Sequence, residues 1–255
     1  MVSTQDIAKH FVDAKGNRVK AVDGVSFEAS PGKIFGLLGC NGAGKTTTLR
    51  ILSTVIKPTA GRATVAGYDV VDHPEKVRAS IGFMSTSTAL YGRLQAKEVI
   101  EYFGQLFGLE GQRLKERVAY VMDKLQIHEF GDRLCDKLST GQKQRVNIAR
   151  TILHDPPVLF FDEPTAGLDV VVSQTVMEFI EEARDMGKTI IFSTHIMSEA
   201  ERLCDQISVI HEGTIRGSGT VQQLKEQTRE VTLEKAFLKL VEFESSYQRE
   251  AEVTA

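Results

Sequence analysis

Residues 39–46 carry the pattern most able to do chemistry, because they read Gly-Cys-Asn-Gly-Ala-Gly-Lys-Thr and match G-x-x-x-x-G-K-[ST]. Glycines let such a loop turn successive N–H groups inward toward phosphate oxygens. A helical pattern over 47–56 follows, and its N-terminus adds a favourable dipole. We therefore expect ATP to be held by Gly39, Cys40, Asn41, Gly42, Ala43, Gly44, Lys45, Thr46 and Thr47, with Lys45 on the β- and γ-phosphates.

An acid pair, Asp162-Glu163, follows directly on the apolar run 158–161. Such a pair alone is more often a solvated strand end, but beside a phosphate loop it predicts a hydrolytic centre. Asp162 and the Thr46 hydroxyl are expected to hold Mg²⁺, and Glu163 to accept a proton from the attacking water. His195, after the run 189–192, is the candidate contact to the γ-phosphate, although a lone histidine there is more often structural.

The elements that position these residues follow an α/β pattern. Continuous apolar runs at 34–38, 158–161 and 189–192 predict central strands covered on both faces, in a mostly parallel sheet. Strand signals vanish between about 87 and 142, where Val118, Val121, Met122 and Leu125 mark one face of a helix. This stretch is predicted to be a helical subdomain inserted in the core.

The C-terminal third ends in two further predicted elements. Residues 207–220, with Glu212-Gly213 as the turn, predict a β-hairpin that completes the core. After about residue 222 we expect one charged helix carrying Leu233, Phe237, Leu238 and Leu240, then a polar tail from Glu242. The apolar face of that helix could pack on its own core, on a second copy or on a regulator. The predicted division is 1–222 for the main domain and 223–255 for the C-terminal helix and tail.

Composition excludes several classes of protein. The net charge of −3 over 255 residues offers no basic field for nucleic acid. Three cysteines without a CxxC pair argue against a disulfide framework or zinc site. No apolar stretch reaches the roughly 18 residues of a membrane helix, and the N-terminus does not read as a signal peptide. We expect a cytoplasmic protein that reaches the inner face of the membrane through a partner.

Two further motifs complete a recognisable set of five. Leu138-Ser139-Thr140-Gly141-Gln142, the phosphate loop, the acid pair, Gly167-Leu168-Asp169 and His195 occur in the order found in ABC transporter ATPases. The resemblance covers about 7–222. It implies a P-loop NTPase core of the RecA-like kind, with an antiparallel β subdomain and an inserted α-helical subdomain, that hydrolyses ATP with Mg²⁺.

The resemblance also implies a head-to-tail dimer, of identical or paralogous chains, with ATP between them. Ser139, Thr140, Gly141 and Gln142 of one chain would face the γ-phosphate held by Lys45 of the other, and Asp169 would lie at the interface. Phe11 stands where the family places an aromatic side chain on adenine, the alternative being a core phenylalanine.

Three positions depart from the family pattern. Cys40 stands where proline is common, and Thr140 replaces the more usual glycine. The glutamine that usually contacts Mg²⁺ is absent after 81–84. Thr86 occupies its register, Ser85 or Ser87 could take the same part, and Gln95 lies too far downstream.

Several segments resemble the NatA group, ATPase subunits of sodium efflux exporters. These segments are 21–27, 85–91 and 192–197. The resemblance implies a separate membrane permease that docks on the helical subdomain around 91–107, where core packing is the alternative role for Tyr91, Tyr102, Phe103 and Phe107. Related branches export drugs, lipids or polysaccharides. A soluble ABC ATPase acting on ribosomes or DNA is a rival hypothesis, but the chain has one cassette, no long coiled-coil insertion and no basic patch. A non-hydrolysing regulatory module is a second rival, and Glu163 argues against it. Import is the third, because the core motifs do not decide the direction of transport.

Overall fold

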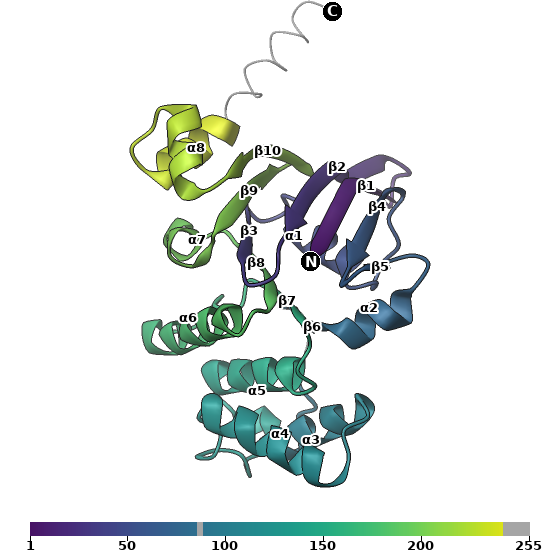
Figure 1. The fold of residues 1–255 in the computed structure, drawn as a ribbon, viewed down its shortest axis with the longest axis vertical. Helices are drawn as coiled ribbons and strands as arrows, with labels where there is room; N and C mark the ends of the chain where they lie inside the picture. The colour runs from purple at the N-terminus through teal and green to yellow at the C-terminus, as the bar shows by residue number, and fades with distance from the viewer. Residues whose placement is uncertain (86–88, 242–255) are drawn as a thin grey trace, which may run out of the picture.

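The computed structural model describes residues 1–85 and 89–241 and contains two β-sheets (Figure 1). The larger sheet has the strand order β10-β9-β3-β8-β7-β6, in which all neighbours are parallel except β10 beside β9. Its strands are β3 (Ile34–Leu38), β6 (Ile81–Met84), β7 (Val158–Asp162), β8 (Thr189–Thr194), β9 (Gln206–His211) and β10 (Thr214–Gly219). The predicted α/β class with a mostly parallel sheet is confirmed.

The central strands contain continuous apolar runs, and both of their faces are buried. In β7, Leu159 and Phe161 join one core cluster, whereas Val158 and Phe160 join the other. This division follows from the alternation of side chains across a strand. One cluster lies against the helices, and the other lies toward the second sheet.

The second sheet is antiparallel, with the order β2-β1-β4-β5. Figure 1 shows it beside helix α1 (Lys45–Leu52) and the larger sheet. Its strands are β1 (Val2–Val12), β2 (Arg18–Ala29), β4 (Ala60–Val65) and β5 (Tyr68–Asp69). The antiparallel β subdomain in the predicted fold class is therefore confirmed.

Helices α3, α4 and α5 pack together at the end of the molecule opposite α8 (Val221–Thr228) (Figure 1). The predicted apolar face of α4 is buried, since Val118, Val121, Met122 and Leu125 all join the core. No helix of the described residues is long and apolar enough to cross a bilayer. The helices before α8 are α1 (Lys45–Leu52), α2 (Pro74–Ser80), α3 (Ala96–Leu106), α4 (Gly111–Lys124), the short 3-10 helix η1 (Cys135–Lys137), α5 (Thr140–Ile152), α6 (Val170–Asp185) and α7 (Met197–Leu203).

The predicted bounds of the first helix, 47–56, were wrong. The helix after the phosphate loop runs from Lys45 to Leu52, and it ends there because Thr54 takes a left-handed conformation at φ 62°. The helix that follows Ser139 starts at Thr140, where Ser139 and Gln142 form a reciprocal capping box.

The predicted hairpin is present, and the single helix expected after 222 is not. Glu212 and Gly213 both have positive φ, as a two-residue type I′ turn requires. Beyond it, α8 (Val221–Thr228) ends at Arg229 in a left-handed conformation, and a separate helix occupies 233–241. Leu233 and Phe237 are buried against β9, α7 and α8, so the self-packing alternative holds for them, whereas Leu238 is exposed. The tail from 242 lies outside the described residues.

Candidate functional site

The phosphate loop leaves the carboxyl end of β3, between the two sheets. Gly39 and Gly44 are required there, because a Cβ would lie 2.3 Å from the carbonyl of Ile210 and 2.6 Å from that of Ala21, respectively. Gly44 also has φ 110°, which L side chains rarely adopt. The residues 41–47, Ala21 and Glu163 enclose a cavity of about 120 Å³. The loop therefore surrounds a small polar space above the N-terminus of α1.

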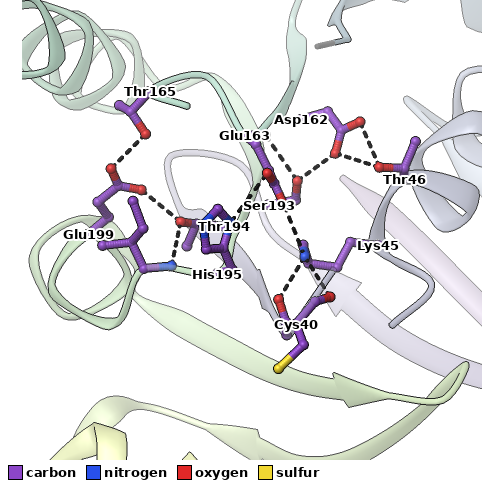
Figure 2. A network of polar contacts seen from close by, with 12 residues as sticks. Cys40, Lys45, Thr46, Asp162, Glu163, Thr165, Ser193, Thr194, His195 and Glu199 are labelled. Carbon is purple, nitrogen blue, oxygen red and sulfur yellow. Dashed lines mark hydrogen bonds and ion pairs between the residues drawn. The ribbon is translucent and has the colours of Figure 1, made fainter. Parts of the chain in front are cut away.

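Lys45 points into this space and is only 4% exposed. Its ammonium group donates to the carbonyls of Gly39 at 2.7 Å and Cys40 at 3.0 Å, and pairs with Glu163 Oε1 at 3.0 Å (Figure 2). A buried ammonium group needs such acceptors. The phosphate oxygens of a nucleotide could replace them.

Asp162 is fully buried at the end of β7. Its carboxylate accepts hydrogen bonds from the hydroxyls of Thr46, at 2.9 and 3.1 Å, and Ser193, at 2.7 Å. The carboxylate and the Thr46 hydroxyl form a compact set of oxygen atoms, which are the ligands that a hard cation such as Mg²⁺ prefers. The donor chemistry thus fits the predicted metal position.

Glu163 is held in an unusual backbone conformation, at φ 49°. Its N–H donates to the carbonyl and to the hydroxyl of Ser193, which fixes the turn after β7 against the end of β8. Burial tends to raise the pKa of Glu163, but contacts with Lys45 and His195 outweigh it and hold the pKa below its ordinary value. The side chain is therefore ionised at neutral pH and able to accept a proton.

His195 follows β8 and faces Glu163, with Nδ1 3.3 Å from Oε2. Its side chain is 42% exposed, so the ring is open to a ligand on its outer side. Figure 2 shows His195, Glu163 and Lys45 converging from separate segments. The structure therefore brings together three predicted site residues from separate motifs.

The signature segment lies at the start of α5. The Ser139 hydroxyl accepts from Gln142 N at 3.2 Å, and Gln142 Oε1 accepts from Ser139 N at 3.0 Å. A Cβ on Gly141 would meet Val172 of α6 at 3.0 Å, so the signature packs against the segment that Asp169 begins. Asp169 caps α6 by accepting from Val172 N at 2.9 Å. The structure brings Thr140 and these neighbours together near Asp169, separate from the residues that surround Lys45.

Phe11 lies near the end of β1, opposite Val19 of β2, and is 43% exposed. The alternative of a core phenylalanine was therefore wrong. Lys9 Nζ lies 5.3 Å from the ring centroid, so the ring already stacks with a cation on the surface. An exposed ring suits stacking on a base.

The predicted metal position at Thr86, with Ser87, lies outside the described residues. Gln95, which was set aside as too distant, caps α3 in a capping box with Glu98. The Gln95 side chain therefore stabilises the N-terminus of α3.

Comparisons with known proteins identify the family of this chain. The family model described as "ABC transporter" matches residues 22–166. The chain is 40% identical to the ABC transporter ATP-binding protein NatA of Bacillus subtilis (strain 168), over 93% of this chain and 97% of that protein. This chain belongs to the ABC transporter ATP-binding family. It is an ATP-binding and ATP-hydrolysing protein of the ABC type.

Other relatives of this ABC ATPase are named for a different transported substrate or only for the ATP-binding cassette. It is 33% identical to the probable multidrug ABC transporter ATP-binding protein YbhF of Escherichia coli (strain K12), over 94% of this chain but only 42% of YbhF. A solved dimeric structure of a post-hydrolysis state of the ATP-binding cassette MJ0796, bound to ADP and Pi, matches with a TM-score of 0.79. The identity is 25%, over 86% of this chain and 98% of that one.

The structure also adds residues of this ABC ATPase that the sequence analysis missed. Ser193 contacts both members of the acid pair, and Gln144 of α5 donates to the carbonyl of Pro164, just after Glu163. The signal available in the sequence was the pair Ser193-Thr194, directly before His195. Asp162 and Glu163, the partners of Ser193, lie about 30 residues away in sequence, so spacing alone could not identify the contact.

Proposed function

We propose that this chain is the ATPase subunit of an ABC exporter that moves sodium ions out of the cell through a separate membrane subunit. The observation that carries the ATPase chemistry is the convergence of Lys45, Asp162 and Glu163 at the edge of the parallel sheet (Figure 2). The sodium assignment rests on the resemblance to the NatA group, supported by 40% identity over nearly the whole of both chains.

In the proposed reaction, Lys45 exchanges its present acceptors for the β- and γ-phosphate oxygens of ATP. Glu163 then loses its 3.0 Å pair with Lys45 and is free to hold a water molecule. The water oxygen attacks the γ-phosphorus, and the bond to the β–γ bridging oxygen breaks. Glu163 takes a proton from the water, His195 contacts the γ-phosphate, and ADP and phosphate leave.

Mg²⁺ is proposed as the ion of this site, held by Thr46 and Asp162. When bound, it would neutralise charge on the β- and γ-phosphate oxygens. Thr46 and Ser193 now satisfy the buried Asp162 carboxylate, and so keep it pointed at the loop.

A second copy of the chain, or a paralogue, is proposed to complete the site. Ser139 lies at the N-terminus of α5, where N–H groups and the helix dipole favour an anion. The four signature residues 139–142 would meet the γ-phosphate held by the other chain, with Asp169 at the interface and Phe11 on adenine. The solved structure of the MJ0796 cassette is a dimer bound to ADP and Pi, which supports dimerisation of this chain.

The permease is proposed to dock at an apolar groove between the helical end of the molecule and the core. A groove of about 540 Å³ is lined by the end of α1, by α2, by β6 and by Leu106 and Phe107 at the end of α3. Val55 and Leu106 are each 62% exposed there. The aromatic residues nearby divide: Phe103 packs against the core, while Tyr91, Tyr102 and Phe107 keep exposed surface.

A charge placed in this groove tests the docking proposal. Leu106→Glu is expected to abolish co-purification with the permease, because an unpaired carboxylate would be buried in an apolar contact. ATP binding by the isolated chain should not change. Leu238→Glu, at an exposed leucine beyond α8, is the matched control and should keep the permease. Equal capture of both variants would contradict docking at the groove.

The transport assignment is tested in proteoliposomes. The chain would be co-expressed with the membrane protein encoded beside it, and ATP added outside would energise only outward-facing ATPase subunits. We expect ATP-dependent ²²Na⁺ uptake with the wild type and none with Glu163→Gln. Uptake in this orientation corresponds to export from a cell. Intact ATPase activity without sodium movement would contradict the sodium assignment.

Drug export is the second candidate, favoured by the similarity to YbhF, whose name describes a probable multidrug transporter. The same proteoliposomes would then take up a fluorescent cationic drug on addition of ATP. Uptake of the drug without ²²Na⁺ would select this candidate.

A further inference from the structure

One carboxylate outside the phosphate site joins the two segments that carry Glu163 and His195. Glu199 lies in the first turn of α7 and is only 7% exposed. One of its oxygens accepts from the Thr165 hydroxyl at 2.6 Å, and the other accepts from the Thr194 hydroxyl at 2.7 Å. Figure 2 shows Glu199 between these two hydroxyl groups.

The two threonines are placed next to the reacting groups. Thr165 stands two residues after Glu163, and Thr194 directly precedes His195. The Thr194 hydroxyl also accepts a hydrogen bond from Ile196 N at 3.0 Å, so it spans the backbone on both sides of His195. Through these contacts, Glu199 ties the turn after β7 to the turn after β8.

The burial of Glu199 and its two hydrogen bonds indicate that this link holds the two turns in a fixed relative position. Burying a carboxylate is costly unless hydrogen bonds compensate it, and bonds to an ionised oxygen are the strong ones. They are also directional, so they fix the relative position of two turns more tightly than apolar packing. Glu163 sits in a left-handed conformation, which persists only where its surroundings hold it.

We propose that Glu199 is a positioning residue for ATP hydrolysis, which keeps Glu163 and His195 in register at the γ-phosphate. The proposal rests on the assignment of Glu163 as general base. Glu199 itself makes its contacts behind the site, through Thr165 and Thr194, and acts on the reacting groups only through them.

Steady-state kinetics of Glu199→Gln test this role. The amide keeps the size of the side chain but replaces one acceptor oxygen with a donor. Because small misplacements of reacting groups are costly, kcat should fall roughly 10- to 100-fold, with ATP affinity and melting temperature close to wild type. Glu201→Gln is the matched control, since Glu201 lies on the same helix and pairs with Lys225 at 2.8 Å; it should keep wild-type kcat.

A second pair of variants avoids any change at Glu199. Thr165→Ser keeps the hydroxyl and should keep kcat, whereas Thr165→Val removes the donor and should lower kcat to a similar extent as Glu199→Gln. This pair decides the question if Glu199→Gln does not fold. Equal kcat in the serine and valine variants would overturn the proposal.

A double-mutant cycle separates positioning from a general structural defect. In a Glu163→Gln background, adding Glu199→Gln should cost less than about twofold further turnover, because its effect passes mainly through Glu163. A further loss of the full size, or wild-type kcat in Glu199→Gln alone, would overturn the proposal while leaving Glu163 as the base. Wild-type turnover in Glu163→Gln alone would instead contradict the base and this inference together.

Discussion

Lys45 and Glu163 form an ion pair in this structure, and in the proposed reaction the loss of this pair would link nucleotide binding to catalysis. The lysine has three acceptors, two loop carbonyls and one Glu163 oxygen. Phosphate oxygens must displace at least the carboxylate for Glu163 to act on water. In the proposed reaction, one side chain would therefore both bind the phosphates and release the base.

Cys40 gives a residue-scale prediction. Its side chain is exposed in the loop, while burial raises the pKa of the Cys135 and Cys204 thiols and lowers their reactivity. A thiol alkylator should therefore modify Cys40 first and inhibit the ATPase, and ATP should protect. Peptide mass spectrometry and activity measured over the same time course check this. Cys40→Ala should resist inhibition; inhibition unchanged in that variant would refute the prediction.

At the scale of elements, the turn just after α5 contains a partly buried histidine that couples folding to pH. His154 stacks on Phe107, with ring centroids 3.6 Å apart, and contacts the carbonyl of Ile81 at 2.9 Å through Nε2. Burial lowers the pKa of His154 from 6.5 to about 4. The folded protein thus holds a neutral ring that donates to the strand β6.

The sign of the resulting pH dependence follows from proton binding. Between pH 6.5 and about 4 the unfolded chain binds more protons at His154 than the folded chain does. The contribution of the neutral His154 to the free energy of unfolding is therefore complete above pH 6.5 and is lost as the pH falls toward 4. The shift corresponds to about 3 kcal/mol. Urea unfolding between pH 7.5 and 4.5 should show this loss.

His154→Gln is the matched variant, because its amide can still donate to the Ile81 carbonyl but does not titrate. Its free energy of unfolding should be nearly flat over that range. The pKa values of Asp155 and Glu163 lie below their ordinary values. Their contributions to the free energy of unfolding are therefore lost at lower pH, and equally in both proteins. The same slope in both would contradict the account.

Elements could be predicted from sequence where the signal was local. The apolar runs located the central strands, and the loop motif located Lys45 and Thr46. Helix ends were missed where a single residue decided them, as Thr54 ends α1 and Arg229 ends α8. Ser193 and Glu199 were missed because their partners Asp162 and Thr165 lie more than 30 residues away and meet them only in the folded sheet.

At the scale of the whole molecule, the proposed site is divided between two copies. Ser139 caps the N-terminus of α5 beside α6, whereas Lys45 begins α1 at the phosphate loop. A head-to-tail dimer would unite them. Each complete site would then contain Lys45 of one chain and Ser139 of the other.

Complementation between inactive variants tests this division. Ser139→Asp should keep the helix cap, but its negative charge should repel the γ-phosphate and so abolish turnover. Ser139→Asn is the control, because asparagine also caps the helix but carries no charge, and it should retain more activity. Lys45→Ala should also be inactive. A mixture of Lys45→Ala and Ser139→Asp should regain activity, since a mixed dimer contains one intact site. No recovery, with mixed dimers shown to form, would contradict the composite site.

The central claim is that this chain hydrolyses ATP with Glu163 as the general base. The most direct measurement is steady-state ATP turnover of purified Glu163→Gln beside wild type, with nucleotide binding and dimerisation measured on the same samples. We expect turnover to fall about 10²- to 10⁴-fold, with ATP still bound and a dimer still formed. Turnover equal to wild type in a folded, ATP-binding Glu163→Gln protein would contradict the claim.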